Sequence, residues 1–358
     1  GSQWMMKTTP SLSVYQDNPE NAGEGLKPLL DFAAGKNLPS ESTFFYLGAT
    51  EIFRELPADV VSKMLVAVNE TVKTYPFQVS SDSVQVITGQ QEGIYGWVAL
   101  NQLMLAFSAG CLQNCYGGLD LGSGSAEITF LGDHIPPASY DFPFTWGAET
   151  FHAYTHSFGG VGYILGLQNI NLTLISSTAA TTIPHPCFLN GFNSTWSYQG
   201  NDYNFVGTGS FDACLNLVKE VMKVDAPCPT PPCSFDGAYQ PPLRGKYAAL
   251  SNFRDVEQFL EGGNSGDNDH SVGYLQKHGS DFCTMSWSDA LAQYGKDYDE
   301  DELSQYCYGS SLTYGLLKGY GFDDSDHVIY EKKVNGIKWS WTLGMSVQKL
   351  RERYEPEP

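Results

Sequence analysis

Two acidic residues lie beside glycine-containing turns that could hold phosphate groups. Glu92 follows an apolar run ending in Thr88-Gly89, and Asp120 begins the segment 120–125, which reads DLGSGS. Backbone N–H groups of a Gly/Ser loop can approach phosphate oxygens closely because no Cβ blocks them. Such turns could therefore place carboxylates beside a phosphate chain. The same glycines also fit a purely structural role in tight turns, and their spacing alone does not decide between the two interpretations.

The segments that must position these turns alternate between strand and helix patterns. Apolar runs typical of strands occur at 43–47, at 84–87 and around Leu119 and Ile128. Helical periodicity is present in the stretches between these runs and in several later segments. This alternation favours a mainly parallel or mixed sheet covered by helices. The predicted helices are at 21–35, 57–68, 92–109, 211–224 and 301–319, with a last one from Trp341, and 139–146 reads as a strand.

Composition limits the class of protein and its partners. The 358 residues are 42% hydrophobic and 17% charged, which is typical of a globular protein, and the length favours two domains. The net charge of −20 argues against nucleic acid as a partner, because phosphate backbones recruit clusters of Lys and Arg. A polyanionic substrate would need a local positive field from a metal ion or from backbone dipoles.

The cysteines and glycosylation sequons favour an oxidising compartment. The pairs Cys111/Cys115 and Cys228/Cys233 are closely spaced, but no His or Cys partners at finger-like spacing accompany them, so disulfides are favoured over zinc. Three N-x-[ST] sequons, at Asn69, Asn171 and Asn193, agree with a secreted or lumenal protein. No run of about 18 apolar residues occurs, so we expect no membrane span in this chain.

Two segments carry a resemblance to a known family. Residues 87–97, ITGQQEGIYGW, resemble the pattern I-[ST]-G-x-E-E-G-x-[YF]-G-W of the ecto-nucleoside triphosphate diphosphohydrolases, or apyrases. Residues 120–130, DLGSGSAEITF, resemble D-L-G-G-A-S-T-Q-I-T-F of the same nucleoside phosphatase family. The resemblance extends over nearly the whole chain, with further similar segments at 46–50, 207–214, 233–242, 282–284 and 341–344.

The resemblance implies an α/β, actin-like architecture with two RNase H-like lobes, mixed sheets flanked by helices, and nucleotide bound in the family's cleft. The first lobe would span residues 1–134 and be incomplete at its N-terminus. The second would span 135–358, with a disulfide-stapled insertion rich in Cys, Pro and Gly at about 184–245. The C-terminal helix is expected to pack back on the first lobe.

The resemblance also implies a chemistry. Family members hydrolyse nucleoside tri- and diphosphates by direct attack of water, with a glutamate as base and one Ca²⁺ or Mg²⁺ as cofactor. By position, Glu92 is the expected base, and Asp120 and Glu92 would contact the metal through water. Trp341 would lie in the metal region. Thr50, Gly122, Ser123, Gly124 and Ser125 would bind the nucleotide's phosphates.

The sequence also departs from the family's patterns. The opening motif D-A-G-S-[ST]-x-[ST]-R has no counterpart, and the similarity begins at 9–13. Residues 51–53 read EIF where the family has A-G-M, and Ser123-Gly124 replaces G-A. Asp255 stands where the family has an aromatic residue that stacks on the nucleobase. An Asp side chain cannot stack in this way.

These departures leave open whether the chain is an enzyme. One hypothesis is an apyrase-like hydrolase whose N-terminal phosphate loop is absent from this sequence, or was cleaved and remains associated. The alternatives are a catalytically inactive homologue, and a structural glycoprotein that forms oligomers or fibres by accepting a partner strand into an incomplete sheet. Family analogy further implies four disulfides, Cys111–Cys115, Cys187–Cys214, Cys228–Cys233 and Cys283–Cys307, although eight cysteines allow many pairings.

Overall fold

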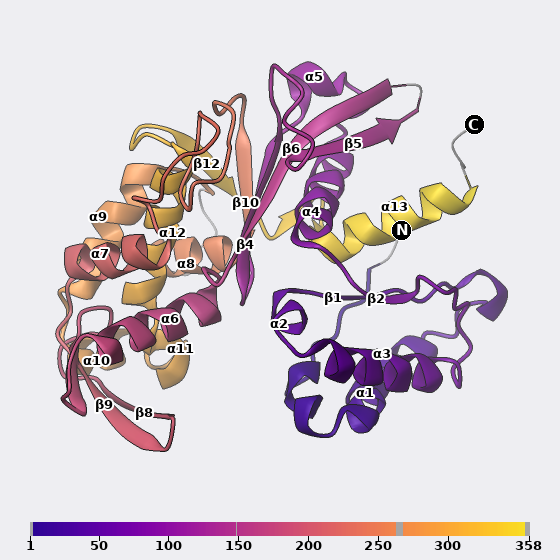
Figure 1. The fold of residues 1–358 in the computed structure, drawn as a ribbon. Coiled ribbons are helices and arrows are strands. Elements are labelled where there is room, and N and C mark those ends of the chain that lie inside the picture. Colours follow the sequence, from indigo (N-terminus) through magenta and orange to yellow (C-terminus); the bar gives the residue numbers. More distant parts are fainter. Residues whose placement is uncertain (1–2, 148, 263–267, 355–358) are drawn as a thin grey trace. The chain divides into compact units, whose positions relative to one another are not determined.

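The computed structural model describes residues 3–147, 149–262 and 268–354 (Figure 1). Contacts divide the chain into two compact units: unit 1 comprises 1–92 and 348–358, and unit 2 comprises 93–347. The division falls inside two helices, α4 (Gly89–Leu103) and α13 (Trp341–Tyr354). The predicted boundary at residue 134 separates the two lobes of the family fold, whereas the two units are defined by contacts. The lobe boundary therefore stays a prediction.

Unit 1 is a small α/β unit with its own apolar core. Its described strands, β1 (Leu47–Ala49) and β2 (Val84–Val86), form a parallel pair. Leu26, Leu30, Met64, Val68 and Val72 are buried where two helices pack together, and Leu47 and Val84 of these strands pack against them. The predicted strand at 43–47 is displaced to Leu47–Ala49, and Phe44 forms only an isolated bridge with Gln78. The helices are α1 (Ala22–Ala34), α2 (Glu51–Arg54) and α3 (Ala58–Val72), with 3₁₀ turns at Leu12–Asp17, Pro19–Asn21 and Ser40–Ser42.

Unit 2 is built on a seven-stranded mixed sheet in the order β11-β12-β10-β3-β4-β6-β5. The central strand β3 pairs in parallel with β10 and antiparallel with β4. All five residues of β3 are buried, which is typical of a strand covered on both faces. The strands are β3 (Gly117–Leu121), β4 (Ser125–Leu131), β5 (Asp141–Trp146), β6 (Glu149–Gly159), β10 (Tyr247–Ser251), β11 (Asp269–Ser271) and β12 (His327–Tyr330).

Smaller sheets and helices complete unit 2. A three-stranded sheet of order β7-β9-β8 lies in the predicted insertion and just before it, and a two-stranded pair precedes α13. The additional strands are β7 (Thr182–His185), β8 (Asn193–Tyr198), β9 (Asn201–Gly207), β13 (Lys333–Val334) and β14 (Ile337–Lys338). The helices are α5 (Cys111–Asn114), α6 (Tyr163–Ser176), α7 (Phe211–Val221), α8 (Asn252–Leu260), α9 (Val272–Cys283), α10 (Trp287–Tyr294), α11 (Glu300–Ser304) and α12 (Tyr306–Tyr320).

Helix α12 is the centre of the helical layer of unit 2. It is buried almost all round, and it packs against α7, α8 and α9 (Figure 1). A helix buried on every side lacks the polar face of a surface helix, and α12 shows this composition. The predicted helix at 301–319 is two helices in the structure, because α11 ends at Ser304 and α12 begins at Tyr306.

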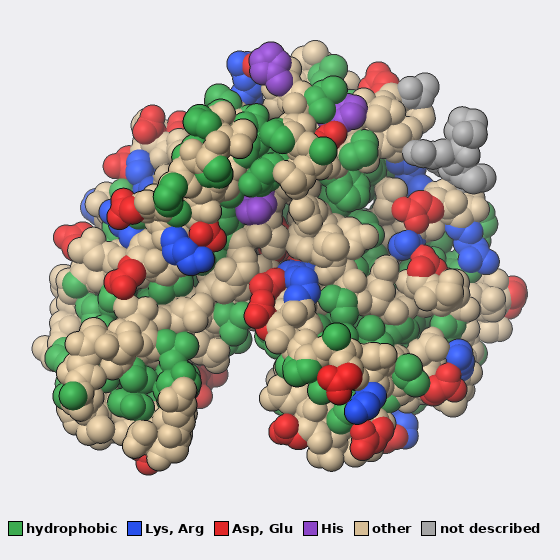
Figure 2. Space-filling model, viewed as in Figure 1, with side chains coloured by type: hydrophobic (Ala, Val, Ile, Leu, Met, Phe, Trp, Pro, Cys, Tyr) green, Lys and Arg blue, Asp and Glu red, His purple; other side chains and the backbone are tan. Residues whose placement is uncertain are grey.

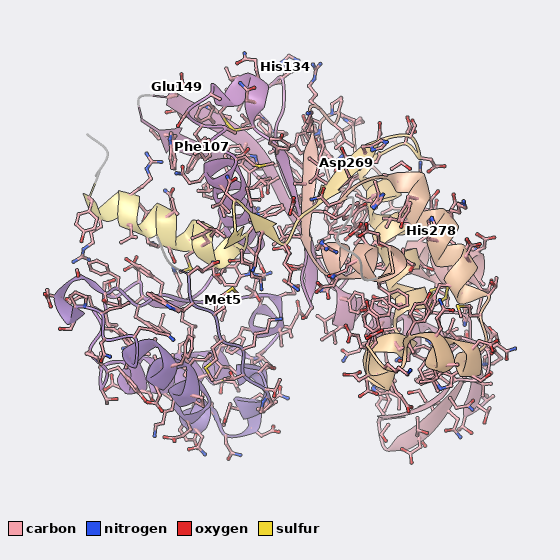
Figure 3. The ribbon with its side chains drawn as sticks, turned by 180° about the vertical axis from the view of Figure 1, so that it is seen from behind. Met5, Phe107, His134, Glu149, Asp269 and His278 are labelled. Atoms are coloured by element: carbon pink, nitrogen blue, oxygen red, sulfur yellow. A yellow bond between two sulfur atoms is a disulfide. The ribbon has the colours of Figure 1, made fainter. Side chains whose placement is uncertain are left out.

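An aromatic cluster closes the other end of the sheet. Phe107, labelled in Figure 3, stacks on Trp146 of β5 with ring centroids 4.4 Å apart. Trp97 of α4 meets Phe144 edge to face at 5.8 Å. The aromatic residues that follow Pro136 in the sequence therefore contribute mainly to the core.

Figure 2 shows Asp and Glu side chains dispersed over the face in view, not gathered in one patch.

Candidate active site

The loop of residues 122–125 connects β3 to β4, and its carbonyl groups are held by the segment that leads into α6. Three consecutive carbonyls accept backbone hydrogen bonds of 2.9–3.2 Å. Gly122 accepts from Tyr163, Ser123 accepts from Ile164 and Leu165, and Gly124 accepts from Gly160 and Gly162. The first N–H groups of a helix have no partner within the helix, and here the loop carbonyls satisfy several of them.

This attachment leaves the loop's own donors available. Within the described ranges, the N–H groups of Ser123 and Gly124 have no hydrogen-bond acceptor. Gly162 permits the close packing, since a Cβ there would lie 2.3 Å from the carbonyl carbon of Gly124 and 2.4 Å from the nitrogen of Ser125. Adjacent free N–H groups in a fixed loop form the kind of concave donor site that binds anions.

Asp120 lies on β3, two residues before this loop. It is 5% exposed, and its Oδ1 atom has no hydrogen-bond partner within the part of the chain that the structure describes. Burial raises the pKa of Asp120 to about 6, because desolvation disfavours the charged carboxylate; a hydrogen bond with the Ser251 side chain opposes this shift. A buried, unsatisfied carboxylate oxygen is costly unless a proton, a cation or water occupies it.

Ser251 is strained at the same edge of the sheet. It is the last residue of β10, it is paired with Leu121 in register, and its φ of 57° lies in the left-handed region. Residues other than glycine rarely adopt this conformation, and such strain clusters at functional sites. The following Asn252 donates a side-chain hydrogen bond of 2.6 Å to the carbonyl of Leu121. The β10–α8 turn is thus fixed against the strand that carries Asp120.

In unit 1, Glu92 lies in the first turn of α4 and is 4% exposed. The guanidinium of Arg54 approaches it, with 3.3 Å between Nη2 and a Glu92 carboxylate oxygen. Arg54 also contacts Glu51 at 2.7 Å through Nε and donates to the carbonyl of Ile87 at 2.7 Å through Nη1. An arginine at this distance favours the ionised form of a carboxylate, which a general base requires.

The remaining predicted residues lie at helix starts. Thr50 is the N-cap residue of α2, but its side chain does not cap the helix. Trp341 begins α13 and is half-buried. Its surroundings in unit 2 are firmly packed, because Trp339 donates from Nε1 to the carbonyl of Gly96 at 2.8 Å, and a Cβ on Gly344 would lie 1.7 Å from the Tyr95 oxygen.

The structure therefore describes two groups of predicted residues. Asp120 and the loop 122–125 are adjacent in unit 2, which also contains Trp341, while Thr50 and Glu92 are in unit 1 beside Arg54. Sequence reasoning missed Arg54 and Glu127. An Arg directly after the departing segment 51–53 was a weak signal for the first, and an acid within the apolar strand 126–130 was a signal for the second.

Asp255 lines a cavity of about 550 Å³ in unit 2, whose lining also includes Tyr294, Tyr298 and Tyr306. Two more acids, Asp297 and Glu302, line the same cavity. Position 255 thus has an Asp where the family has an aromatic ring, but tyrosines line the same cavity. A larger cavity of about 1030 Å³ contains none of the predicted site residues.

A separate group of metal-ligand types lies on α8 and β11. Ligand atoms of Glu257, Glu261 and His270 are all within 4.8 Å of one another. Glu257 is fully buried, and it already pairs with Arg254 at 3.0 Å and with His270 at 3.1 Å. Arg254 offsets the charge of Glu257, whereas the contact with His270 is an ion pair only when its imidazole is protonated.

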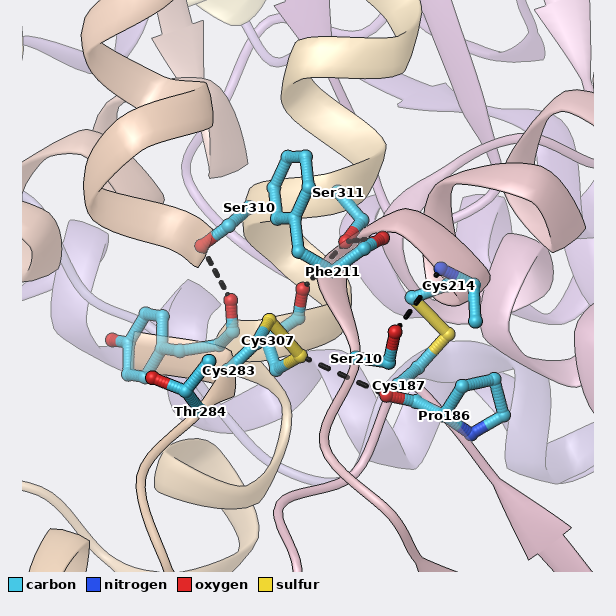
Figure 4. The surroundings of a disulfide bond; sticks show 12 residues. Pro186, Cys187, Ser210, Phe211, Cys214, Cys283, Thr284, Cys307, Ser310 and Ser311 are labelled. Atoms are coloured by element: carbon cyan, nitrogen blue, oxygen red, sulfur yellow. Dashed lines mark hydrogen bonds between the residues drawn. A yellow bond between two sulfur atoms is a disulfide. The ribbon is translucent and has the colours of Figure 1, made fainter. Parts of the chain in front are cut away.

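Four disulfides join the pairs that the family analogy implied: Cys111–Cys115, Cys187–Cys214, Cys228–Cys233 and Cys283–Cys307. Figure 4 shows two of them near the N-terminus of α7, where Ser210 caps the helix at Ala213. Among the sequons, Asn193 is exposed and Asn69 half-buried, whereas Asn171 is 7% exposed and its side chain contacts His185 at 3.0 Å. A glycan on Asn171 would remove this buried contact, so the geometry disfavours glycosylation there. Glycosylation of Asn69 and Asn193, whose side chains are more exposed, stays a prediction.

Known proteins resemble this chain over nearly its whole length. It is 28% identical to mouse (Mus musculus) ectonucleoside triphosphate diphosphohydrolase 1, over 94% of this chain and 72% of that protein. It is 30% identical to the bovine (Bos taurus) protein of the same name, over 91% and 70% respectively. A probable apyrase 4 of Arabidopsis thaliana is 26% identical, over 95% of this chain and 71% of that protein.

Solved structures show the same fold. A nucleoside triphosphate hydrolase of Neospora caninum matches with a TM-score of 0.66 at 15% identity, over 98% of this chain and 83% of that one. A Ppx/GppA family member of Aquifex aeolicus matches with a TM-score of 0.52 at 12% identity, over 96% and 87%. The predicted α/β, actin-like fold with mixed sheets flanked by helices is thereby confirmed.

Among the described residues, no helix has the length and apolar character needed to cross a bilayer.

The family model for the GDA1/CD39 (nucleoside phosphatase) family matches residues 2–355. The motifs at 87–97 and 120–130, the fold and these relatives agree with that match. The chain belongs to the GDA1/CD39 nucleoside phosphatase family.

Proposed function

We propose that this protein hydrolyses nucleoside tri- and diphosphates by direct attack of water on the terminal phosphate, in a secreted or lumenal setting. The observation that carries the proposal is the loop 122–125, which is anchored through its carbonyls and keeps the N–H groups of Ser123 and Gly124 without acceptors. Donors fixed before the substrate arrives stabilise developing phosphate charge without reorganisation. The ectonucleoside triphosphate diphosphohydrolases that resemble this chain support the substrate class.

Glu92 is the proposed general base. Arg54 holds its carboxylate and favours the ionised state, so Glu92 can accept a proton from water. Thr50 would bind a phosphate oxygen with its hydroxyl. Ser125 would do so only by giving up its present hydrogen bond to Glu127 Oε1, which is 2.5 Å long. The tyrosines that line the cavity beside Asp255 would contact the nucleobase, and Tyr298 among them is half-buried.

The residues present fit a hard divalent cation. The buried Oδ1 of Asp120 lacks a partner, and oxygen ligands are those that Ca²⁺ and Mg²⁺ prefer. When bound, such an ion would neutralise phosphate charge that a protein of net charge −20 otherwise repels. By resemblance, Asp120 and Glu92 would contact it through water, with Trp341 in the same region.

A phosphate-release assay tests the proposal. We expect the purified protein to release phosphate from ATP and ADP when Ca²⁺ or Mg²⁺ is present, and Glu92→Gln to reduce the rate by a factor of about 10² or more. Glu20→Gln, an exposed acid in the same unit, is the control and should leave the rate unchanged. Equal turnover by Glu92→Gln and the wild type would rule out Glu92 as the base.

A second candidate is an inactive homologue that assembles with itself or with a partner strand. In the described part of unit 1, β1 and β2 form a sheet of only two strands, which leaves edges available for strand addition. Glu51 and Asp255, which depart from the family pattern, favour this candidate. It predicts no thermal shift with a non-hydrolysable ATP analogue plus Ca²⁺, and oligomers in sedimentation at high concentration.

A further inference from the structure

Three side chains of metal-ligand type meet where α8 ends beside the edge strand β11 of the large sheet. Glu257 lies on α8, and Glu261 is the C-cap residue four positions later, so both side chains lie on the same face of the helix. His270 is the central residue of β11 and is opposite Val328 of β12. One ligand atom from each of the three side chains lies within 4.8 Å of the other two. This spacing allows all three to reach a single ion.

The contact between His270 and Glu257 has the spacing of two ligands that share an ion. Nε2 of His270 lies 3.1 Å from Oε1 of Glu257, yet Nε2 forms no hydrogen bond within the part of the chain that the structure describes. The ring plane fixes the direction of an N–H group, and at Nε2 this direction does not lead to the carboxylate. Two donor atoms that are each about 2.0–2.1 Å from a tetrahedral zinc ion are about 3.3 Å apart. The observed distance is close to this value.

Neighbouring side chains hold these two ligands in place. Arg254 donates from Nη1 to Oε2 of Glu257 at 3.0 Å, so the other oxygen of this carboxylate is the one that faces His270. The His270 imidazole stacks on the ring of Tyr274, with centroids 4.0 Å apart and planes inclined by 9°. Contacts of this kind, made by the atoms that do not bind the metal, orient the ligands of metal sites in proteins.

A buried tyrosine hydroxyl gives an independent indication of a ligand at this place. Tyr330 of β12 is fully buried, and its hydroxyl has no hydrogen-bond partner within the described ranges. Burial, and then the charges of Glu257 and Asp269, raise the pKa of Tyr330, so the phenol keeps its proton beside these acids. An unsatisfied buried hydroxyl is costly. Water on an ion held by the neighbouring carboxylate would accept its hydrogen bond.

We propose that Glu257, Glu261 and His270 bind one Zn²⁺ ion through two carboxylates and a neutral imidazole. Zinc takes nitrogen and oxygen ligands together, and three protein ligands plus water complete its shell, whereas Ca²⁺ and Mg²⁺ take oxygen ligands. The ion would join the end of α8 to β11, and so fix the helix that carries Asp255 of the proposed nucleobase cavity. None of its ligands belongs to the phosphate loop, and the inference does not depend on hydrolysis.

Calorimetric titration of the metal-free protein with ZnCl₂, in the presence of excess CaCl₂, tests the site. We expect one Zn²⁺ per chain in the wild type, and affinity weaker by about 100-fold or more in His270→Gln, because a direct ligand contributes at least as much as an outer contact. Glu261→Gln should also weaken binding. Since Glu261 is half-buried, this second variant keeps the test valid if the first folds poorly.

Two further variants separate the zinc site from a role in packing. Tyr330→Phe should leave the metal-free fold intact, because the lost hydroxyl has no partner in the described part of the chain, and should weaken zinc binding about tenfold. His327→Gln is the matched control: this exposed histidine pairs with Asp269 on the neighbouring strand, and its loss should not change the affinity. Equal zinc affinity in Tyr330→Phe and the wild type would contradict the position assigned to the ion.

Other outcomes would overturn the inference. These are no zinc binding by the folded wild type, undiminished binding in both His270→Gln and Glu261→Gln, and displacement of the bound zinc by calcium. Loss of binding in His152→Gln, with full binding in His270→Gln, would instead assign the ion to the pair that His152 forms with Asp141 at 2.8 Å.

Discussion

At the scale of single residues, the important feature is that one guanidinium contacts two buried acids. Arg54 is shared between Glu51 and Glu92, and both acids are less than 10% exposed. The segment at 51–53 departs from the family pattern. Glu51, within this segment, can influence Glu92 because both acids contact Arg54. Position 51 is therefore expected to tune how firmly Arg54 holds the proposed base.

We predict that Arg54→Ala lowers kcat for ATP by about 10- to 100-fold, because it removes a charge-assisted hydrogen bond to Glu92. KM should change little if Arg54 acts through Glu92 and not on substrate. Arg54→Lys should recover part of kcat, and Lys63→Ala, which removes an exposed ion pair with Asp59, is the control. Equal losses for Lys and Ala at position 54, with KM raised, would instead indicate direct contact with phosphate.

His185 provides a test of stability against pH. It is fully buried, Nδ1 accepts from the Cys187 N–H at 3.3 Å, and Nε2 therefore donates to Asn171 at 3.0 Å. Burial lowers the pKa of His185 to about 3, below its usual value near 6.5. The neutral ring thus stabilises the fold above pH 6.5, and this contribution is lost as the pH falls towards 3, by on the order of 3 kcal/mol at pH 4.

Chemical denaturation between pH 4 and 7 measures this effect. We expect the free energy of unfolding of His185→Gln to vary less with pH than that of the wild type. His134→Gln, a change at an exposed histidine labelled in Figure 3, should keep the wild-type slope. Identical slopes for all three proteins would show that His185 is not responsible.

At the scale of elements, the phosphate loop depends on the segment that starts α6. Its three carbonyls are held by residues 160–165, and Gly162 packs directly against its backbone. Backbone atoms cannot rotate away as a side chain can. A substituent at position 162 must therefore move either the loop or the start of the helix.

We predict that Gly162→Ala destabilises the protein by about 1–3 kcal/mol and reduces turnover, since the added Cβ would displace Gly124 and Ser125. Gly96→Ala is a matched control: a Cβ there meets nothing within 4 Å, and alanine in a helix is favoured over glycine by about 1 kcal/mol. Thermal unfolding and phosphate release measure both variants. An unchanged melting temperature for Gly162→Ala would contradict the proposed packing.

At the scale of the whole molecule, the four disulfides all lie in unit 2, and the described core of unit 1 is held by apolar packing alone. The disulfides differ in the chain length that they close. Cys187–Cys214 spans 27 residues and Cys111–Cys115 spans 4. Longer closed loops restrict the unfolded chain more, so their bonds contribute more to stability.

We predict that replacing Cys187 and Cys214 by serine costs about 3.5 kcal/mol, against about 2 kcal/mol for the Cys111/Cys115 pair. The melting temperature of the first variant should fall by roughly 5 to 7 °C. Differential scanning calorimetry of both variants beside the wild type provides the measurement. A larger loss for the short-range pair would show that chain entropy is not the main contribution.

The sequence by itself determined the family and the alternation of strands and helices. These are local properties: periodicity follows from side-chain alternation along each element, and the motifs 87–97 and 120–130 are contiguous. The family analogy also paired the cysteines as the structure does. Element limits were less accurate, as with the strand at 47–49 and the break at Gln305, because hydrogen bonding decides where an element ends.

Only the tertiary structure brought together residues that are distant in sequence. Arg54 reaches Glu92 across 38 positions, Ser251 reaches Asp120, and Ser157 reaches Glu127 across 30 positions. Pairing of β3 with β4 and β10, and of β4 with β6, sets the contacts of Asp120 and Glu127, and strand register is a long-range property that no local pattern records. For the same reason, the burial that leaves Asp120 without a partner, and that encloses the side chain of Asn171, became visible only in the folded chain.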